Sequence, residues 1–303
     1  MKCFYHDDAD GKCAGFWVYL NVGIKIDSKT GEPQESECIA INYNDKFPLD
    51  KIKENEQIWI VDFSIPVEDM EKLLQITKDV TWIDHHISSI SKYKDFKEKI
   101  NGVRYDGISG CELTYAYIHK MTLDRGNSGI IEHDFNEEML KDCPLMTRYV
   151  GDRDVWKFKF GDNSRYFYEA FLMAGQPNPD SEWWFNVMDT LKLEQQISIG
   201  DICREHSKNL SQSTLKSWGY EAKFKEHIIL VCNSTNRSSD LFGDKINDYP
   251  FVCAYTHDGN KFFVSFYSVN MDVNHYAEEF GGGGHKRACG FVCDELPFKR
   301  IYK

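Results

Sequence analysis

A short apolar segment that ends in three polar residues places the strongest constraint on the fold. Residues 80–83 read Val-Thr-Trp-Ile, and Asp84, His85 and His86 follow directly. Such a run is typical of a buried strand in an α/β sheet, where ligands bind beyond the carboxyl ends of the strands. Neighbouring side chains on a strand point to opposite faces, so two consecutive histidines cannot both be idle core residues. The triplet therefore indicates a functional site at a sheet edge.

The chain is acidic, because 36 Lys and Arg residues stand against 48 Asp and Glu residues, for a formal net charge of −12. Long nucleic acids bind mainly to basic surfaces, so this balance argues against a long polymer as the substrate. A short anionic substrate is compatible if bound cations reverse the local field. Ten scattered cysteines without a Cys-x-x-Cys pair favour free thiols in a reducing compartment. Without an apolar leader or a long apolar run, we expect a cytoplasmic protein with no membrane partner.

Three further segments place carboxylates or imidazoles just beyond predicted strands or helices. They are His6, Asp8 and Asp10 after residues 2–5, Asp62 after residues 58–61, and Asp152 with Asp154 after a predicted helix over residues 136–150. Carboxylates packed this closely repel one another unless a cation offsets their charge. Taken alone, residues 6–11 also fit a solvated acidic turn. Because parallel strand ends converge on one sheet edge, we expect these groups to meet the triplet.

Ligation mainly by carboxylates with a few imidazoles favours Mn²⁺, Mg²⁺ or Fe²⁺ over a metal that prefers thiolates. The ligands suffice for two ions that share one carboxylate.

The pattern of predicted helices and strands changes near residue 219. Residues 1–185 predict a parallel α/β domain, and residues 186–218 predict a long linker helix with little Gly or Pro. Residues 219–303 predict a smaller mixed α/β domain, in which Asp258-Gly259 is a hairpin signal between two strands.

The ordered set of motifs resembles the DHH/DHHA1 phosphoesterase family over nearly the whole chain. The motifs are His6-x-Asp8-x-Asp10-Gly11, Asp62, Asp84-His85-His86, an aspartate at 152 or 154, and Gly282-Gly283-Gly284-His285. Residues 151–156, Gly-Asp-Arg-Asp-Val-Trp, and the compact length look most similar to the oligoribonuclease (nanoRNase)-like branch. The resemblance implies a parallel-sheet DHH domain, a long helix and a smaller mixed α/β DHHA1 domain, with the active-site cleft between the domains.

The resemblance also implies two divalent cations, Mn²⁺ first, with Mg²⁺ or Fe²⁺ as alternatives. One ion would be held by His6, Asp8 and Asp62, and the other by Asp10, Asp62, His85 and an aspartate, for which we favour Asp154 over Asp152. His86 would face the substrate phosphate, and Asp84 would fix a histidine tautomer. Asp62, Asp84 and His86 are thus the expected catalytic residues. The implied reaction is attack of water on the phosphorus of a phosphodiester.

A glycine segment in the last domain predicts a phosphate-binding loop. Its expected substrate-binding residues are Gly282, Gly283, Gly284, His285, Lys286 and Arg287, although a flexible turn is the alternative interpretation. Many relatives carry Ser-x-Arg-Ser before this segment, whereas this chain has Tyr267 at the arginine position. Tyrosine cannot make a bidentate phosphate contact, and Arg237 is a speculative substitute.

The favoured function is degradation of short single-stranded RNA or DNA oligonucleotides to mononucleotides, as in a nanoRNase-like exonuclease. The first alternative is a phosphodiesterase for cyclic or linear signalling dinucleotides, and the second is an inactive nucleotide-binding module. Trp183-Trp184 and Tyr166-Phe167-Tyr168 could stack on bases, but we interpret them as core or domain-interface aromatics. Monomer and homodimer both remain open.

Overall fold

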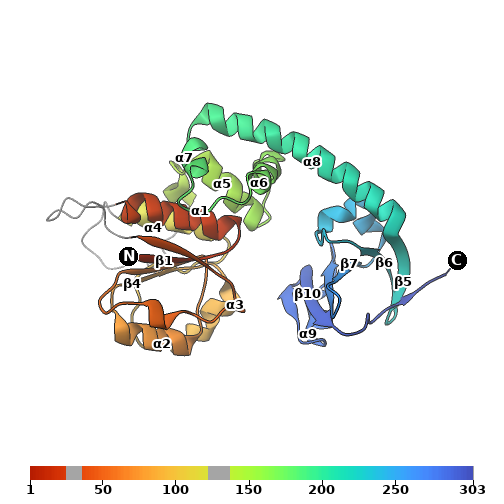
Figure 1. Cartoon of the computed structure of the whole chain (residues 1–303), viewed down its shortest axis with the longest axis horizontal. Coiled ribbons are helices and arrows are strands. Elements are labelled where there is room, and N and C mark those ends of the chain that lie inside the picture. The colour runs from red at the N-terminus through yellow and green to blue at the C-terminus, as the bar shows by residue number, and fades with distance from the viewer. Residues whose placement is uncertain (25–35, 122–136, 303) are drawn as a thin grey trace. The chain divides into compact units, whose positions relative to one another are not determined.

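The computed structural model describes residues 1–24, 36–121 and 137–302. The chain divides into two compact units, Met1–Cys203 and Arg204–Lys303, which are described separately (Figure 1). Within the described residues, no helix combines the length and the apolar composition needed to cross a membrane.

Unit 1 is built on a parallel sheet of four short strands. These are β1 (Lys2–His6), β2 (Glu37–Ile41), β3 (Ile58–Val61) and β4 (Val80–Ile83), in the order β2-β1-β3-β4. The chain places β2 on one side of β1 and then crosses to place β3 on the other side. Such a change of direction opens a crevice at the carboxyl ends of the strands, where α/β proteins bind ligands.

Helices cover both faces of this sheet (Figure 1). On one face lie α1 (Ala9–Val18) and α4 (Gly110–Met121), and on the other lies α2 (Val67–Ile76). Each face has its own apolar core, one around Phe16 and Trp17 and the other around Ile60 and Leu73. Coverage of both faces explains why every residue of β3 and β4 is buried, as their apolar sequences predict.

Further helices complete unit 1. They are α3 (Ile87–Ile90), α5 (Leu145–Asp154), α6 (Asn163–Met173), α7 (Glu182–Asn186), the π-helical turn Tyr19–Gly23, and the 3₁₀ turns Leu49–Lys51, Ser91–Tyr93 and Glu137–Leu140. Pro144, which we expect to bend or divide the helix predicted over residues 136–150, divides it: Pro144 occupies the N-cap of α5 and separates that helix from the preceding 3₁₀ turn. Residue 136 itself lies outside the described ranges. Beyond β4, Asp84 and Arg104 form an isolated parallel bridge.

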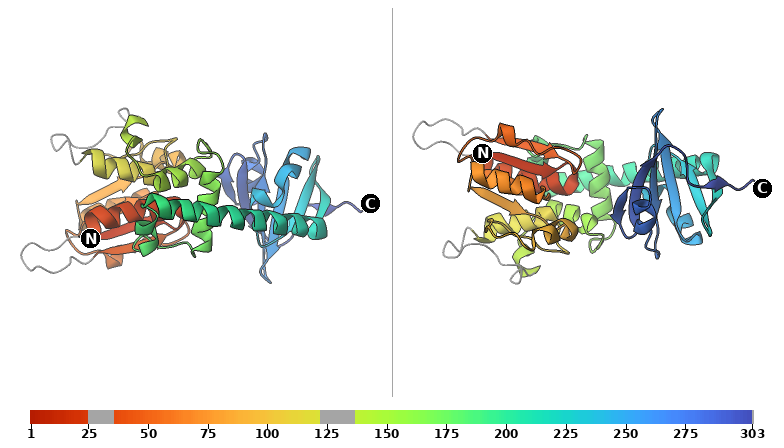
Figure 2. Two further views of the ribbon diagram at one scale, coloured as in Figure 1. Left: turned by 90° about the horizontal axis from the view of Figure 1, so that it is seen from above. Right: turned by 90° about the horizontal axis from the view of Figure 1, so that it is seen from below.

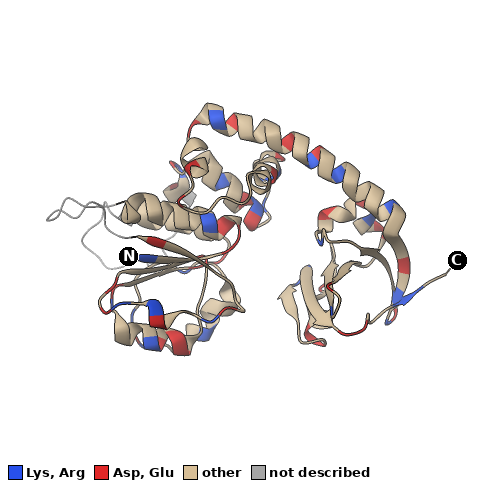
Figure 3. Cartoon of the chain, viewed as in Figure 1, with Lys and Arg blue, Asp and Glu red and all other residues tan. Residues whose placement is uncertain are grey.

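The boundary between the two units falls within α8 (Thr190–Trp218), an unbroken helix (Figure 2). Basic and acidic residues occur along its whole length (Figure 3), as is usual for a helix exposed to solvent.

Unit 2 contains one mixed sheet of seven strands. They are β5 (Gly219–Phe224), β6 (His227–Asn233), β7 (Val252–His257), β8 (Phe262–Tyr267), β9 (Gly283–His285), β10 (Ala288–Cys293) and β11 (Lys299–Arg300), in the order β11-β5-β6-β7-β8-β10-β9. Only the β6–β7 pair is parallel. The predicted hairpin joins β7 to β8, and α9 (Asn274–Glu278) packs on the sheet through Tyr276. Two 3₁₀ turns, Ser239–Leu241 and Gly243–Asp248, follow β6. The predicted fold class, a parallel α/β unit followed by a smaller mixed one, is confirmed.

Candidate metal centre

The segment that connects β1 to α1 and begins α1 holds two carboxylates in different ways. Asp8 caps α1, since its Oδ1 accepts a hydrogen bond from Gly11 N at 2.9 Å, and its Oδ2 lies 2.8 Å from His6 Nδ1. Burial alone would raise the pKa of Asp8, but the hydrogen bond and charge of His6 outweigh it and lower the pKa to about 2. Although the Asp8 side chain is 43% exposed, these contacts fix it at the start of α1.

Asp10 points to the N-terminus of a helix that lies 100 residues further along the chain. Its side chain is 1% exposed and accepts hydrogen bonds from Gly110 N at 2.7 Å and Cys111 N at 2.9 Å. These are the first amide groups of α4, where the helix dipole favours a negative charge. The fold thus fixes the Asp10 carboxylate in place.

Asp62, which follows β3, has a carboxylate whose burial is energetically unfavourable in the absence of a partner. It is 1% exposed, and neither carboxylate oxygen accepts a hydrogen bond from any described residue. His85 Nε2 lies 3.1 Å from Oδ1 but outside hydrogen-bond geometry. Burial, followed by the charges of Asp10 and Asp8, raises the pKa of Asp62 well above its ordinary value. An unpartnered, buried carboxylate among like charges is the environment that a bound cation stabilises.

Asp84 holds the two histidines that follow β4. Its carboxylate accepts hydrogen bonds from Ser64 Oγ and from His85 N at 2.7 Å, and it lies 2.7 Å from His86 Nδ1. Burial is the largest single influence and acts to raise the pKa of Asp84, but the hydrogen bonds and charge of His86 and the hydrogen bond from Ser64 together lower it. The pKa of His86 responds in the opposite sense: burial lowers it, and the contact with Asp84 more than compensates and raises it. Asp84 therefore orients the ring of His86.

The two aspartates of α5 have different surroundings. Asp152 accepts hydrogen bonds from Lys159 N at 2.7 Å, Phe160 N at 3.3 Å and Ser164 Oγ at 2.5 Å, so its charge is already satisfied within the loop that follows α5. Asp154 instead lies with its Oδ2 3.4 Å from His85 Nε2, and burial and the Asp10 charge raise its pKa. The structure thus brings Asp154, and not Asp152, to the other candidate ligands.

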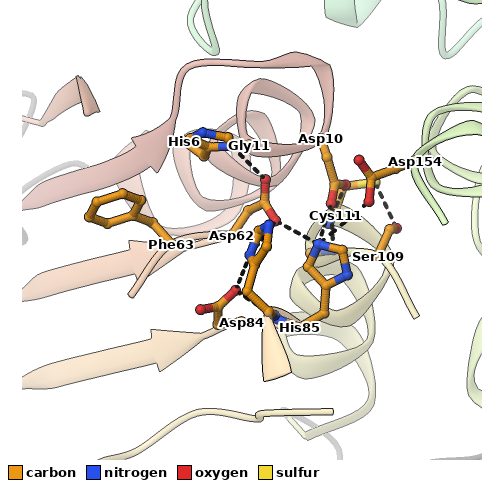
Figure 4. A network of polar contacts seen from close by, with 12 residues as sticks. His6, Asp10, Gly11, Asp62, Phe63, Asp84, His85, Ser109, Cys111 and Asp154 are labelled. Atoms are coloured by element: carbon orange, nitrogen blue, oxygen red, sulfur yellow. Dashed lines mark hydrogen bonds and ion pairs between the residues drawn. The ribbon is translucent and has the colours of Figure 1, made fainter. Parts of the chain in front are cut away.

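Figure 4 shows the carboxylates of Asp10, Asp62 and Asp154 around the ring of His85. Three sets of potential ligand atoms each lie within 4.8 Å of one another: His6, Asp8 and Asp62; Asp62, His85 and His86; and Asp10, His85 and Asp154. We call these seven residues the metal centre. The donors are mostly carboxylate oxygens with three imidazoles, and the unpartnered oxygens of Asp62 lie among them. This donor set fits hard or intermediate divalent cations such as Mn²⁺.

Two glycines allow the elements of the metal centre to approach closely. A Cβ on Gly11 would lie 2.0 Å from the carbonyl oxygen of His6, and a Cβ on Gly110 would lie 2.6 Å from Cβ of Asp62. Any side chain at either position would displace a residue of the metal centre.

Comparison with known proteins identifies the fold. No family model matches the sequence. Uncharacterized protein R106 of Acanthamoeba polyphaga mimivirus is 26% identical over 317 residues, which cover 98% of this chain and 68% of that protein. Among solved structures, the DHH domain of PF0399, a member of a family of ribosomal proteins, matches with a TM-score of 0.58 and 12% identity over 99% of this chain and 82% of its own.

The chain has the DHH-domain fold. RecJ from Thermus thermophilus in complex with Mn²⁺ matches with a TM-score of 0.51 and 13% identity, over 97% of this chain and 49% of its own. A manganese-bound exonuclease RecJ matches with a TM-score of 0.50 and 12% identity, over 97% of this chain and 86% of its own. The resemblance predicted from the sequence is confirmed at the level of the fold.

In unit 2 of this DHH-fold protein, the glycine segment is partly a strand. Gly283–His285 forms β9 and pairs with β10 at the sheet edge, where Gly284 lies opposite Cys289. The side chains of His285, Lys286 and Arg287 are exposed. Gly282 packs against the sheet so closely that a Cβ there would lie 2.1 Å from the carbonyl oxygen of Gly290.

Arg237, proposed as a substitute for the arginine that Tyr267 replaces, lies beside Tyr267. The Tyr267 hydroxyl donates a hydrogen bond to the carbonyl oxygen of Arg237, whose exposed guanidinium lies 5.6 Å from the ring centroid of Phe263.

Sequence reasoning missed three contributors to the metal centre. Ser64 supports Asp84, and the amides of Gly110 and Cys111 hold Asp10. The only sequence signal for the amides was the Gly-rich start of a predicted helix, which indicates a helix N-terminus but not the anion that it binds.

Proposed function

We propose that this DHH-fold protein is a metal-dependent phosphodiesterase that hydrolyses short oligonucleotides to mononucleotides. The observation that carries the proposal is Asp62, a buried carboxylate without a hydrogen-bond donor, surrounded by three aspartates and three histidines that can act as ligands. The manganese-bound RecJ structures share the fold and support Mn²⁺ as the metal. The acidic composition favours a short substrate over a long polymer.

The residues of the metal centre would have different roles in catalysis. Divalent cations bound there would lower the pKa of the attacking water and offset the charge on the phosphoryl oxygens. Asp62 would be shared by two of the three ligand sets, since it belongs both to the set of His6 and Asp8 and to the set of His85 and His86. Asp10 would keep a fixed position because the α4 amides hold its carboxylate.

His86 would contact the reacting phosphate. Its Nδ1 faces the Asp84 carboxylate, whose lowered pKa keeps it ionised, so Nδ1 carries the proton. This leaves Nε2 as the free ring nitrogen. The raised pKa of His86 favours its protonated form, in which Nε2 would donate a hydrogen bond to a phosphoryl or leaving oxygen.

Unit 2 would contribute substrate contacts. We assign this role to Gly282, Gly283, Gly284, His285, Lys286, Arg287 and Arg237. Their support is the exposed position of His285 at the end of β9, of Lys286 and Arg287 directly after it, and of the Arg237 guanidinium.

The test compares three substrates with the Mn²⁺-loaded protein: a linear dinucleotide, a five-nucleotide RNA and a cyclic dinucleotide. We expect mononucleotides from the dinucleotide and the five-mer, measured by ion-exchange chromatography, and no product after addition of a chelator. Cleavage of the cyclic compound alone would replace this proposal with a signalling phosphodiesterase. Binding of nucleotide without any turnover would indicate an inactive module instead.

A further inference from the structure

A cavity of about 230 Å³ adjoins the metal centre within unit 1. Its lining includes Asp8, Asp10 and Asp154, which belong to the metal centre. It also includes Arg153 of α5 and Tyr168 of α6, together with Gln176. A substrate whose phosphate lies at the metal centre would therefore have the adjoining part of the same molecule beside this cavity.

Arg153 is the distinctive residue of the cavity. Its guanidinium carbon lies 3.2 Å from the ring centroid of Tyr168, so one face of the guanidinium is stacked on an aromatic ring. Among the residues that the structure describes, no carboxylate forms an ion pair with Arg153. Its charge acts on the neighbouring Asp154 carboxylate without a close ion pair, so the N–H donors of its guanidinium are available to a ligand.

The walls of the cavity suit a flat, aromatic ligand better than an isolated phosphate. Phe167, Tyr168 and Phe171 line it, and of these three only Tyr168 is exposed enough to offer ring surface to a ligand. Guanidinium planes and aromatic rings are the surfaces on which proteins stack nucleobases. Arginine and glutamine side chains also make bidentate hydrogen bonds with guanine and adenine, respectively. The volume lies below the roughly 300–1,000 Å³ of pockets that enclose whole drug-sized ligands, so it fits one ring system and not a dinucleotide.

We propose that this cavity binds a nucleobase of the substrate, which stacks on the outer face of the Arg153 guanidinium above Tyr168. The proposal rests on the proposed function for the presence of a nucleotide phosphate at the metal centre. It also revises one interpretation made from the sequence: Phe167 is a core residue, but the neighbouring Tyr168 is half-buried and lines the cavity.

The experiment measures binding and not turnover, so it is independent of catalysis. AMP, GMP and ribose 5-phosphate are titrated into the Mn²⁺-loaded full-length protein by isothermal calorimetry. The mononucleotides and the sugar phosphate share the phosphate and differ in the base. We expect AMP and GMP to bind at least tenfold more tightly than ribose 5-phosphate, which corresponds to about 1.4 kcal/mol and lies within the range for stacking of one base.

Two variants and one matched control locate the effect. Arg153→Lys keeps the charge but removes the planar group, and Tyr168→Leu removes the ring beneath that group. Both variants should bind AMP and GMP less than threefold more tightly than ribose 5-phosphate. The control is Arg165→Lys, because Arg165 also stacks on a ring, that of Phe158 at 3.6 Å, but does not line the cavity. This control should keep the full preference.

Several outcomes would overturn the inference. One is equal binding of AMP and ribose 5-phosphate by the wild type, and another is an undiminished preference in both cavity variants that retain the wild-type fold by circular dichroism. An equal loss of all three ligands in Arg153→Lys would mean that Arg153 binds the phosphate. If the base preference depends on the cavity as expected but no substrate is hydrolysed, the proposed function fails and the cavity assignment stands.

Discussion

Replacing Asp62 by asparagine should have opposite effects on the metal-free and the metal-bound protein. The substitution removes one negative charge and preserves the shape of the side chain. The backbone should tolerate it, since Asp62 has a φ of 54° and asparagine adopts this left-handed region more readily than most residues. The difference between wild type and variant therefore reports the charge.

The metal-free protein should become more stable at neutral pH. Burial and neighbouring carboxylates raise the folded-state pKa of Asp62 above its unfolded value of about 3.9. The folded state then binds more protons than the unfolded state, so stability falls as the pH rises from about 4 through the folded pKa. At pH 7 the wild type carries this penalty and Asp62→Asn does not. Relief of such functional strain commonly stabilises a protein by about 0.5–2 kcal/mol.

The size of unit 1, residues 1–203, converts this energy into a melting temperature. In a domain of about 150–250 residues, 1 kcal/mol shifts Tm by about 2–4 °C, so the metal-free variant should melt about 1–8 °C higher than the wild type. Mn²⁺ at 100 times its Kd should stabilise the wild type by about 2.7 kcal/mol, or about 5–11 °C. The variant lacks an anionic ligand and should lose most of this second shift.

Asp152→Asn is the matched control. Asp152 is equally buried, at 4% exposed, but its carboxylate accepts two backbone hydrogen bonds and one from Ser164. Loss of the charge there should destabilise the protein by about 1–3 kcal/mol, because an amide leaves some of these donors poorly paired. Its Tm should fall with and without metal, and the Mn²⁺-dependent shift should remain.

Differential scanning calorimetry of the three proteins at pH 7, in EDTA and in MnCl₂, distinguishes these effects. The reasoning is refuted if metal-free Asp62→Asn melts lower than the wild type, since Asp62 would then be stabilised by the protein alone. A full Mn²⁺ shift in Asp62→Asn would show that Asp62 is not a metal ligand.

Three further predictions concern other parts of the molecule. Asp84→Asn should reduce kcat by about 10- to 100-fold with metal still bound, and should move the His86 ionisation in a pH–rate profile to lower pH, because the contact that raises the His86 pKa is weakened. Burial raises the pKa of Glu112 to about 7, against the opposing charge of its partner Arg148. Wild-type stability should therefore fall as the pH rises from about 4.5 to about 7. In thermal melts, Glu112→Gln should flatten this pH dependence, by about 3 kcal/mol at most. His285→Ala should raise KM for a dinucleotide about tenfold and leave the Mn²⁺-dependent Tm shift unchanged; a lost shift would place His285 at the metal.

The sequence predicted the strands of unit 1 well because their signal is local. Both β3 and β4 are short apolar runs that stop abruptly at a charged residue, and coverage on both faces demands such runs. The acidic residues that follow the strands in the sequence were then expected to meet, since parallel strands end at one edge of the sheet. This prediction did not require the order of the strands within the sheet.

Asp154 is favoured over Asp152 only through the family resemblance, because the residues themselves do not distinguish the two. Residues two apart on a helix face different directions, so only one of the pair can point toward a given site, but the spacing alone does not say which one. The choice depends on where the chain goes next, because the loop after α5 returns its amides to Asp152. Interactions made by backbone amides, such as those of α4 with Asp10, leave no trace in residue type and stay hidden until the fold is known.

The close approach of α1 and α4 to the metal centre has a consequence for mutational tolerance. At Gly11 and Gly110, a substitution would be harmful because of the space that a side chain needs and not because a functional group is lost. The carbonyl of His6 and the side chain of Asp62 occupy the volume that a Cβ would take. A variant library would therefore contain two kinds of inactive clone, those that lack a ligand and those that keep every ligand but fill a gap. A survey that scores only the acidic and histidine positions would count the second kind as intact, and would misjudge which sequences can still assemble the centre.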